Sequence, residues 1–197
     1  MMKPNLNRRH LLAGLAGATV LPEALMAQAT PKNGGLLKIS HSTRIAQLNV
    51  LQLSGPAEYL AVDMIYSGLT RLNPKMTPEP ELATEWTASP DAKTFTFKLR
   101  PNVTFHDGQP LTSADVVATF KTILDPAAKS PARSVLDMIV DIVAVDPMTV
   151  RFDLKVPYAD LPVSVAHATA RIVWQAALTR PLTELDTKAN GTGPFKI

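Results

Sequence analysis

Cysteine is absent from this sequence of 197 residues, and histidine occurs only four times. Without cysteine the chain has no disulfide, no thiolate zinc site, no catalytic thiol and no lipidated cysteine. An imidazole is a common metal ligand and general base, but His106 has no second histidine or cysteine near it in the sequence. We therefore predict no metal site, no cofactor and no catalytic residue.

A strong excess of charge of one sign is also missing. The formal net charge is +3, but residues 1–29 alone contain three basic residues and one acidic residue. The rest of the chain has 17 basic and 16 acidic residues, a net charge of +1, so nothing favours nucleic acid as a partner. Apolar residues make up 46% of the chain, which is typical of a protein with a packed core.

The N-terminus has the three-part pattern of a secretion signal. A polar, basic segment over residues 3–9 precedes an apolar segment over 11–21 and then Ala27-Gln28-Ala29. The apolar segment is too short to cross a bilayer as a permanent helix. Small side chains at Ala27 and Ala29 fit the pocket of a signal peptidase. We predict a cleavable signal peptide over residues 1–29 and a periplasmic protein.

Two adjacent arginines, Arg8 and Arg9, indicate the export route. One residue separates them from Leu11 and Leu12, an order that resembles the twin-arginine signal. An ordinary secretion signal that contains two arginines by chance is the alternative. After Leu37 no stretch is long and apolar enough for a membrane-spanning helix.

The body of the chain has the pattern of a mixed α+β unit. Its clearest element is the strictly alternating segment 94–99, which predicts a strand. This strand can pair with residues 85–88 through a turn at 89–92. Further strands are expected over 36–40, 69–72, 139–145 and 149–154, and the last two form a second hairpin.

A first helix is expected to begin at Pro56, because proline suits the first turn of a helix. Leu60, Met64 and Ile65 would form its apolar side, and Gly68 is placed to end it.

A second helix follows a predicted turn at 106–108. Gly108 permits a positive φ there, and Asp107 can bond nearby backbone amides. Thr112 is placed to cap the helix, with Asp115 as a short-armed capping box. Turn and cap explain the two aspartates better than an acid–base pair does. The predicted apolar face consists of Val116, Val117, Phe120, Ile123 and Leu124.

Five segments carry a resemblance to a known family. They are YSGLTRLNP (66–74), ELATEW (81–86), TFTFKLRPNVTFHDGQPLTSADVVATF (94–120), AVDPMTVRFDLKVPYADL (144–161) and GTGPFKI (191–197). In this order they resemble the peptide, dipeptide and nickel family of ABC substrate-binding proteins, solute-binding protein family 5. The third segment is the most characteristic of the five.

The resemblance implies the α+β and α/β fold of type II periplasmic binding proteins, in which two lobes close over a ligand. Residues 30–65 would begin lobe one, and 66–188 would form a small α+β domain packed on it. Residues 189–197 would form a strand that returns into lobe one. Family members are longer, and the second lobe is missing from this sequence. We therefore expect the isolated 197-residue chain to be poorly soluble or only partly folded.

The resemblance also implies a function without catalysis. The protein would capture a peptide or another small-molecule ligand for an ABC permease in the inner membrane. Asn49, Tyr59 and Tyr66 are the candidate ligand-binding residues, and surface or packing roles are the alternative for all three. A truncated, non-functional fragment is a second interpretation. An exported hydrolase is a third, although no serine, histidine and aspartate set supports it.

Overall fold

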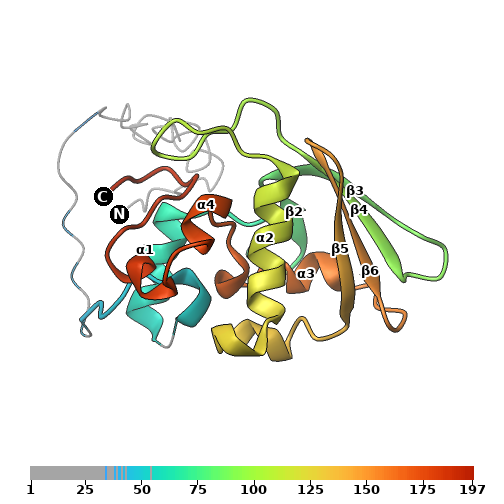
Figure 1. The fold of residues 1–197 in the computed structure, drawn as a ribbon, viewed down its shortest axis with the longest axis horizontal. Coiled ribbons are helices and arrows are strands. Elements are labelled where there is room, and N and C mark those ends of the chain that lie inside the picture. Colours follow the sequence, from blue (N-terminus) through green and yellow to red (C-terminus); the bar gives the residue numbers. More distant parts are fainter. Residues whose placement is uncertain (1–33, 35–37, 39, 41, 43, 54) are drawn as a thin grey trace, which may run out of the picture. The chain divides into compact units, whose positions relative to one another are not determined.

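The computed structural model describes residues 34, 38, 40, 42, 44–53 and 55–197 (Figure 1). The chain divides into two units, residues 1–40 and residues 41–197. The predicted signal peptide and most of the predicted strand over 36–40 lie outside the described residues. The domain boundaries that we predict after residues 65 and 188 fall inside the second unit. They stay predictions.

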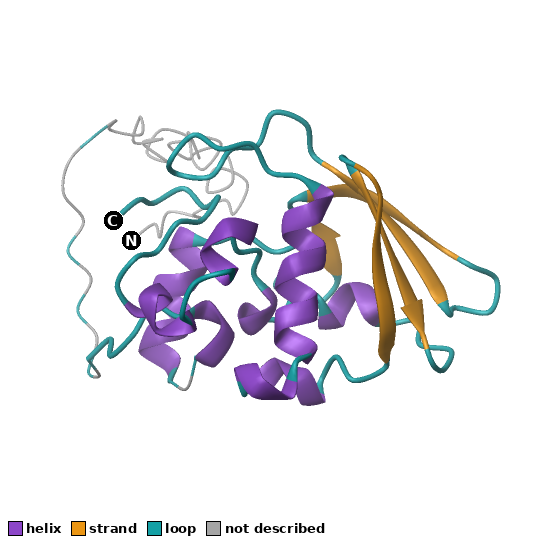
Figure 2. Ribbon diagram, viewed as in Figure 1, coloured by secondary structure: helices purple, strands orange, loops and turns teal. Residues whose placement is uncertain are grey.

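Both predicted hairpins are present and join into one antiparallel sheet, which lies at one end of the unit (Figure 2). Phe95 pairs with Phe152 and Phe97 with Val150, so the apolar residues of neighbouring strands share a face. The sheet has the order β3–β4–β6–β5, formed by β3 (Ala83–Ala88), β4 (Thr94–Leu99), β6 (Thr149–Leu154) and β5 (Ile139–Asp146).

Helix α2 (Ser113–Leu124) packs against β5 and β6. The ring of Phe120 meets Phe152 edge-to-face at a centroid distance of 5.0 Å, and Phe152 meets Phe97 in the same way at 5.4 Å. Such pairs add about 0.5–1.5 kcal/mol to the free energy gained by burial. Of the predicted apolar face, Val116, Phe120 and Ile123 are buried, while Val117 and Leu124 are half-buried.

The predicted capping box of α2 is confirmed. One carboxylate oxygen of Asp115, Oδ2, accepts hydrogen bonds from the backbone N–H and the hydroxyl of Thr112, each at 2.9 Å. The other oxygen, Oδ1, accepts from the backbone N–H of Gln175 at 2.9 Å. Asp115 therefore also fixes a segment 60 residues further along the chain.

Helix α1 (Pro56–Ile65) begins where it was predicted but differs in two respects. Leu60 is 42% exposed, so the predicted apolar side is only partly buried. The helix ends at Ile65 rather than near Gly68, because Tyr66 has an extended backbone with φ −117° and ψ 154°. The short strand β1 (Thr70–Leu72) follows and pairs with β2 (Pro78–Pro80), which was not predicted.

The region after β6 contains short helices and no strand. Residues 189–197, predicted as a strand that returns into lobe one, form no strand in this structure, and their place in lobe one stays a prediction. Two amides of this segment bond helix α1 instead: Gly193 N–H donates to Ile65 O at 2.8 Å and Phe195 N–H to Met64 O at 3.1 Å. The remaining helices are η2 (Val50–Gln52), η3 (Pro126–Ala128), η4 (Pro131–Ser134), α3 (Leu161–Ser164), η5 (Ala168–Ala170), α4 (Gln175–Leu178) and η6 (Leu182–Asp186).

Candidate functional site

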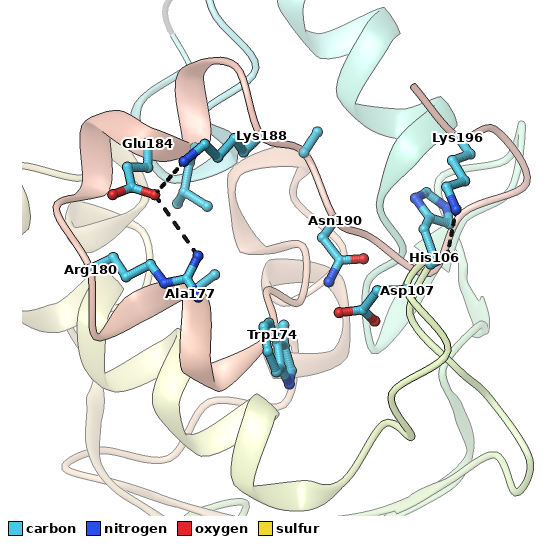
Figure 3. A pocket seen from close by; sticks show the side chains of 11 residues that line it. His106, Asp107, Trp174, Ala177, Arg180, Glu184, Lys188, Asn190 and Lys196 are labelled. Carbon is cyan, nitrogen blue, oxygen red and sulfur yellow. Dashed lines mark hydrogen bonds and ion pairs between the residues drawn. The ribbon is translucent and has the colours of Figure 1, made fainter.

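A cavity of about 300 Å³ lies between the turn at residues 106–108 and the segment from Trp174 to Lys196 (Figure 3). We call it the Trp174 cavity. Its size is at the lower end for small-ligand sites in proteins. It is lined by His106, Asp107, Trp174, Ala177, Arg180, Glu184, Leu185, Lys188, Ala189, Asn190 and Lys196.

The predicted turn that forms one wall of this cavity is confirmed. Gly108 has φ +88°, a conformation that favours glycine. Asp107 Oδ1 accepts a hydrogen bond from the backbone N–H of Gln109 at 3.1 Å. Its Oδ2 has no hydrogen-bond donor among the residues that the structure describes. One carboxylate oxygen thus remains available to a ligand.

His106 ties this turn to the last segment of the chain. Its Nε2 lies 2.9 Å from the Gly193 carbonyl oxygen, and its Nδ1 lies 3.4 Å from the Gly191 amide nitrogen. A carbonyl only accepts and an amide N–H only donates, so the ring is the neutral tautomer with its proton on Nε2. Lys196 Nζ adds a hydrogen bond to the backbone oxygen of His106 at 2.9 Å. His106 is therefore a structural clamp as well as a lining residue.

The two glycines held by this clamp leave no room for a side chain. A Cβ on Gly193 would lie 2.6 Å from the backbone of Met64 and Ile65, and a Cβ on Gly191 would come closer still to the Ile65 carbonyl. Glycine at positions 191 and 193 is thus explained by close backbone packing on the end of α1.

The opposite rim of the Trp174 cavity is charged. Glu184 Oε2 lies 3.0 Å from Lys188 Nζ and 4.0 Å from Arg180 Nη1, and both residues are four positions away in the sequence. These three side chains are well exposed, so each pair contributes less than about 1 kcal/mol. Two cations against one carboxylate leave this rim with a net positive charge.

A second cavity, of about 380 Å³, contains Tyr59 and His167, whose rings meet edge-to-face at 6.4 Å. Beside it Arg171 bridges two carboxylates, with Nη2 2.8 Å from Asp63 Oδ1 and Nη1 2.9 Å from Glu81 Oε2. Burial raises the pKa of Glu81, and the nearby Arg171 guanidinium offsets part of that rise. This network joins α1, the segment between β2 and β3, and the segment after η5.

The three residues that we predict as ligand contacts do not line one common cavity. Asn49 is fully buried: its Oδ1 accepts from Leu51 N–H at 3.2 Å and its Nδ2 donates to Leu182 O at 3.0 Å. Tyr59 lines the second cavity. Tyr66 is 1% exposed, and burial raises the pKa of its hydroxyl to about 12, an effect that the backbone of Asn190 reduces.

A third hollow is apolar and open, with a volume of about 510 Å³. Phe195 and Ile197 contribute to it and are 58% and 72% exposed. Within the described part of the chain, no helix has the length and hydropathy to cross a membrane. No three acidic or histidine side chains in that part are placed to hold a metal ion.

More than half of the chain matches the model of a known protein family. Residues 77–197 match the model of the bacterial extracellular solute-binding proteins, family 5 Middle. The chain belongs to this family. The match includes the whole four-stranded sheet, helix α2 and both walls of the Trp174 cavity.

Two relatives show how far the sequence similarity extends. The glutathione-binding protein GsiB of Escherichia coli O1:K1 / APEC is 33% identical over 132 residues, which are 67% of this chain and 26% of GsiB. The probable peptide ABC transporter periplasmic-binding protein y4tO of Sinorhizobium fredii is 30% identical over 195 residues, 98% of this chain and 36% of y4tO. The chain thus spans about a quarter to about a third of the length of these relatives.

Solved structures confirm the type of fold. The binding protein AgaA from A. tumefacien R10, in complex with agropinic acid, has a TM-score of 0.72 at 35% identity. The match covers 77% of this chain and 30% of AgaA. DppA from Helicobacter pylori, in complex with the peptide STSA, has a TM-score of 0.67 at 28% identity over 76% of this chain and 34% of DppA.

Proposed function

We propose that this chain is part of the substrate-binding component of an ABC importer. It would capture peptides or similar small ligands in the periplasm and deliver them to a permease in the inner membrane. The observation that carries the proposal is the family match over residues 77–197, supported by a fold shared with periplasmic binding proteins. The relatives are transport proteins, which argues against an enzyme.

The names of the relatives set the range of ligands to test. One is named for glutathione, one for peptides, and two solved structures contain the peptide STSA and agropinic acid. A screen for this protein should therefore contain short peptides and organic acids.

Binding is best tested by isothermal titration calorimetry with the protein purified from a periplasmic extract. We expect one or a few members of the panel to bind with micromolar affinity or better and to be recovered chemically unchanged. Hydrolysis of a bound peptide, detected by mass spectrometry, would contradict the proposal. So would a complete lack of binding across the panel.

Export would depend on the signal peptide over residues 1–29, with cleavage after Ala29. The intact mass of the periplasmic protein tests the cleavage site. Replacement of Arg8 and Arg9 by lysine together tests the twin-arginine route. We expect the double variant to stay in the cytoplasm, whereas export at the normal level would indicate the general secretion pathway.

Tyr59 is the best supported of the three proposed ligand residues, because its ring lines a cavity beside His167. A Tyr59→Ala variant should bind the ligand found in the screen more weakly. Asn49→Ala is expected to act mainly on stability, because the Asn49 amide already bonds Leu51 and Leu182.

A further inference from the structure

We infer that the Trp174 cavity binds an amino-acid-sized zwitterion, with its ammonium group beside Asp107 and Asn190 and its carboxylate near Arg180 and Lys188. This inference goes beyond the proposed function. The cavity is lined by described residues of this chain, so a ligand can bind there in the absence of a permease.

The first observation concerns acceptors without donors. Asn190 Oδ1 is buried and has no hydrogen-bond partner among the described residues. In Figure 3 its amide projects towards the space between Trp174 and Asp107, whose Oδ2 also lacks a donor. A buried acceptor without a donor is unfavourable, so the corner beside Asn190 Oδ1 is expected to hold a group with N–H or O–H donors.

The second observation explains why that group should be a cation. Asp107 supplies a negative charge, and Trp174 supplies an indole ring beside it (Figure 3). A carboxylate, an amide oxygen and an aromatic ring together recognise an ammonium group through charge-assisted hydrogen bonds and a cation–π contact. The nearby ammonium of Lys196 does not fill this role, because it donates to the backbone oxygen of His106.

The third observation concerns the other end of the cavity. Glu184 is shared by Arg180 and Lys188, so the two cations are only partly neutralised and can attract a carboxylate. These side chains are exposed, whereas the ammonium end offers the buried Asn190 Oδ1, so the carboxylate end should contribute less affinity. The remaining lining is apolar, with Ala177, Leu185 and Ala189, and it suits an aliphatic side chain. Together the three zones match an amphipathic amino acid.

The test compares three probes on the unaltered protein by calorimetry: L-leucine, N-acetyl-L-leucine and L-leucinamide. We expect L-leucine to bind at millimolar concentration or below. Acetylation removes the ammonium group and should weaken binding about tenfold or more. Amidation removes the carboxylate and should weaken it only a few-fold. Equal binding of L-leucine and its N-acetyl derivative, or no binding of L-leucine at millimolar concentration, would overturn the inference.

A variant pair then places the probe in the cavity. Asp107→Asn removes the charge but keeps the Oδ1 that accepts from Gln109 in the turn. We expect it to weaken L-leucine binding about threefold, because the Asp107 carboxylate is exposed. The control is Asp137→Asn, an exposed carboxylate paired with Lys155 outside this cavity. Unchanged binding in Asp107→Asn, or an equal loss in both variants, would contradict the assignment. The three-probe comparison remains decisive if a variant fails to fold.

Discussion

His106 Nε2 donates a hydrogen bond of 2.9 Å to the carbonyl of Gly193, a residue 87 positions later in the chain. Together with the contact between His106 Nδ1 and Gly191, this bond holds the last described segment on the turn at 106–108. The same segment bonds the end of α1 through Gly193 and Phe195. His106 thus connects three parts of the chain that are distant in sequence.

We predict that His106→Leu loosens this segment. The ring's two hydrogen bonds to the backbone are lost, which should lower the free energy of unfolding by about 1–3 kcal/mol. Hydrogen exchange at the amides of Gly193 and Phe195 should accelerate, because both bond the end of α1 in this segment. His167→Leu is the control, since among the described residues the His167 ring hydrogen-bonds only Thr169, two residues away. Unchanged exchange in His106→Leu would contradict the clamp.

A second prediction concerns the tight packing of Gly191. Gly191→Ala would push a Cβ into the Ile65 carbonyl, and we expect a loss of about 1–3 kcal/mol in the free energy of unfolding. Gly55→Ala is the matched control, because a Cβ there meets only the Glu58 carboxylate, at 3.6 Å and with an ordinary φ of −138°. Urea unfolding of both variants makes the comparison. Equal effects would show that the segment can move away from α1.

The sequence predicted the sheet and the start of α2 because their signals are local. Strict alternation over Thr94–Leu99 determines which side chains are buried, and the turn after β3 is only five residues long. The capping box of Thr112 and Asp115 likewise depends on residues three positions apart. These local patterns do not depend on how distant segments of the chain pack.

The clamp and the Trp174 cavity could not be predicted in this way. His106 was correctly predicted as part of a turn, but its bonds to 191–193 depend on how two distant segments pack. The bond between Asp115 and Gln175 has the same non-local origin. The exposure of Leu60 was not predicted, because helical spacing identifies the apolar side of a helix but not how much of that side other segments bury.

A third prediction follows from the raised pKa of Glu81, whose main cause is burial. The folded state then holds the Glu81 proton more tightly than the unfolded state. Its contribution to stability is full below pH 4.5, the ordinary value, and is lost as the pH rises through the raised value. Glu81→Gln should therefore flatten the pH dependence of the urea midpoint just above pH 4.5. An unchanged pH dependence of the urea midpoint in Glu81→Gln would contradict this prediction.

The last prediction compares Tyr66 with Tyr158, whose hydroxyl forms a hydrogen bond. The Tyr66 hydroxyl is buried without a hydrogen-bond partner of ordinary geometry among the described residues, so Tyr66→Phe should leave stability unchanged or raise it by up to about 1 kcal/mol. Tyr158→Phe should lower it by about 1 kcal/mol, because that hydroxyl bonds Ser164 at 3.1 Å. Spectrophotometric titration should show that the phenolate signal lost in Tyr66→Phe has a pKa of about 12 rather than 10.0. A clear loss of stability in Tyr66→Phe would mean that the hydroxyl has a partner, and a loss of ligand affinity without a loss of stability would support its proposed contact with the ligand.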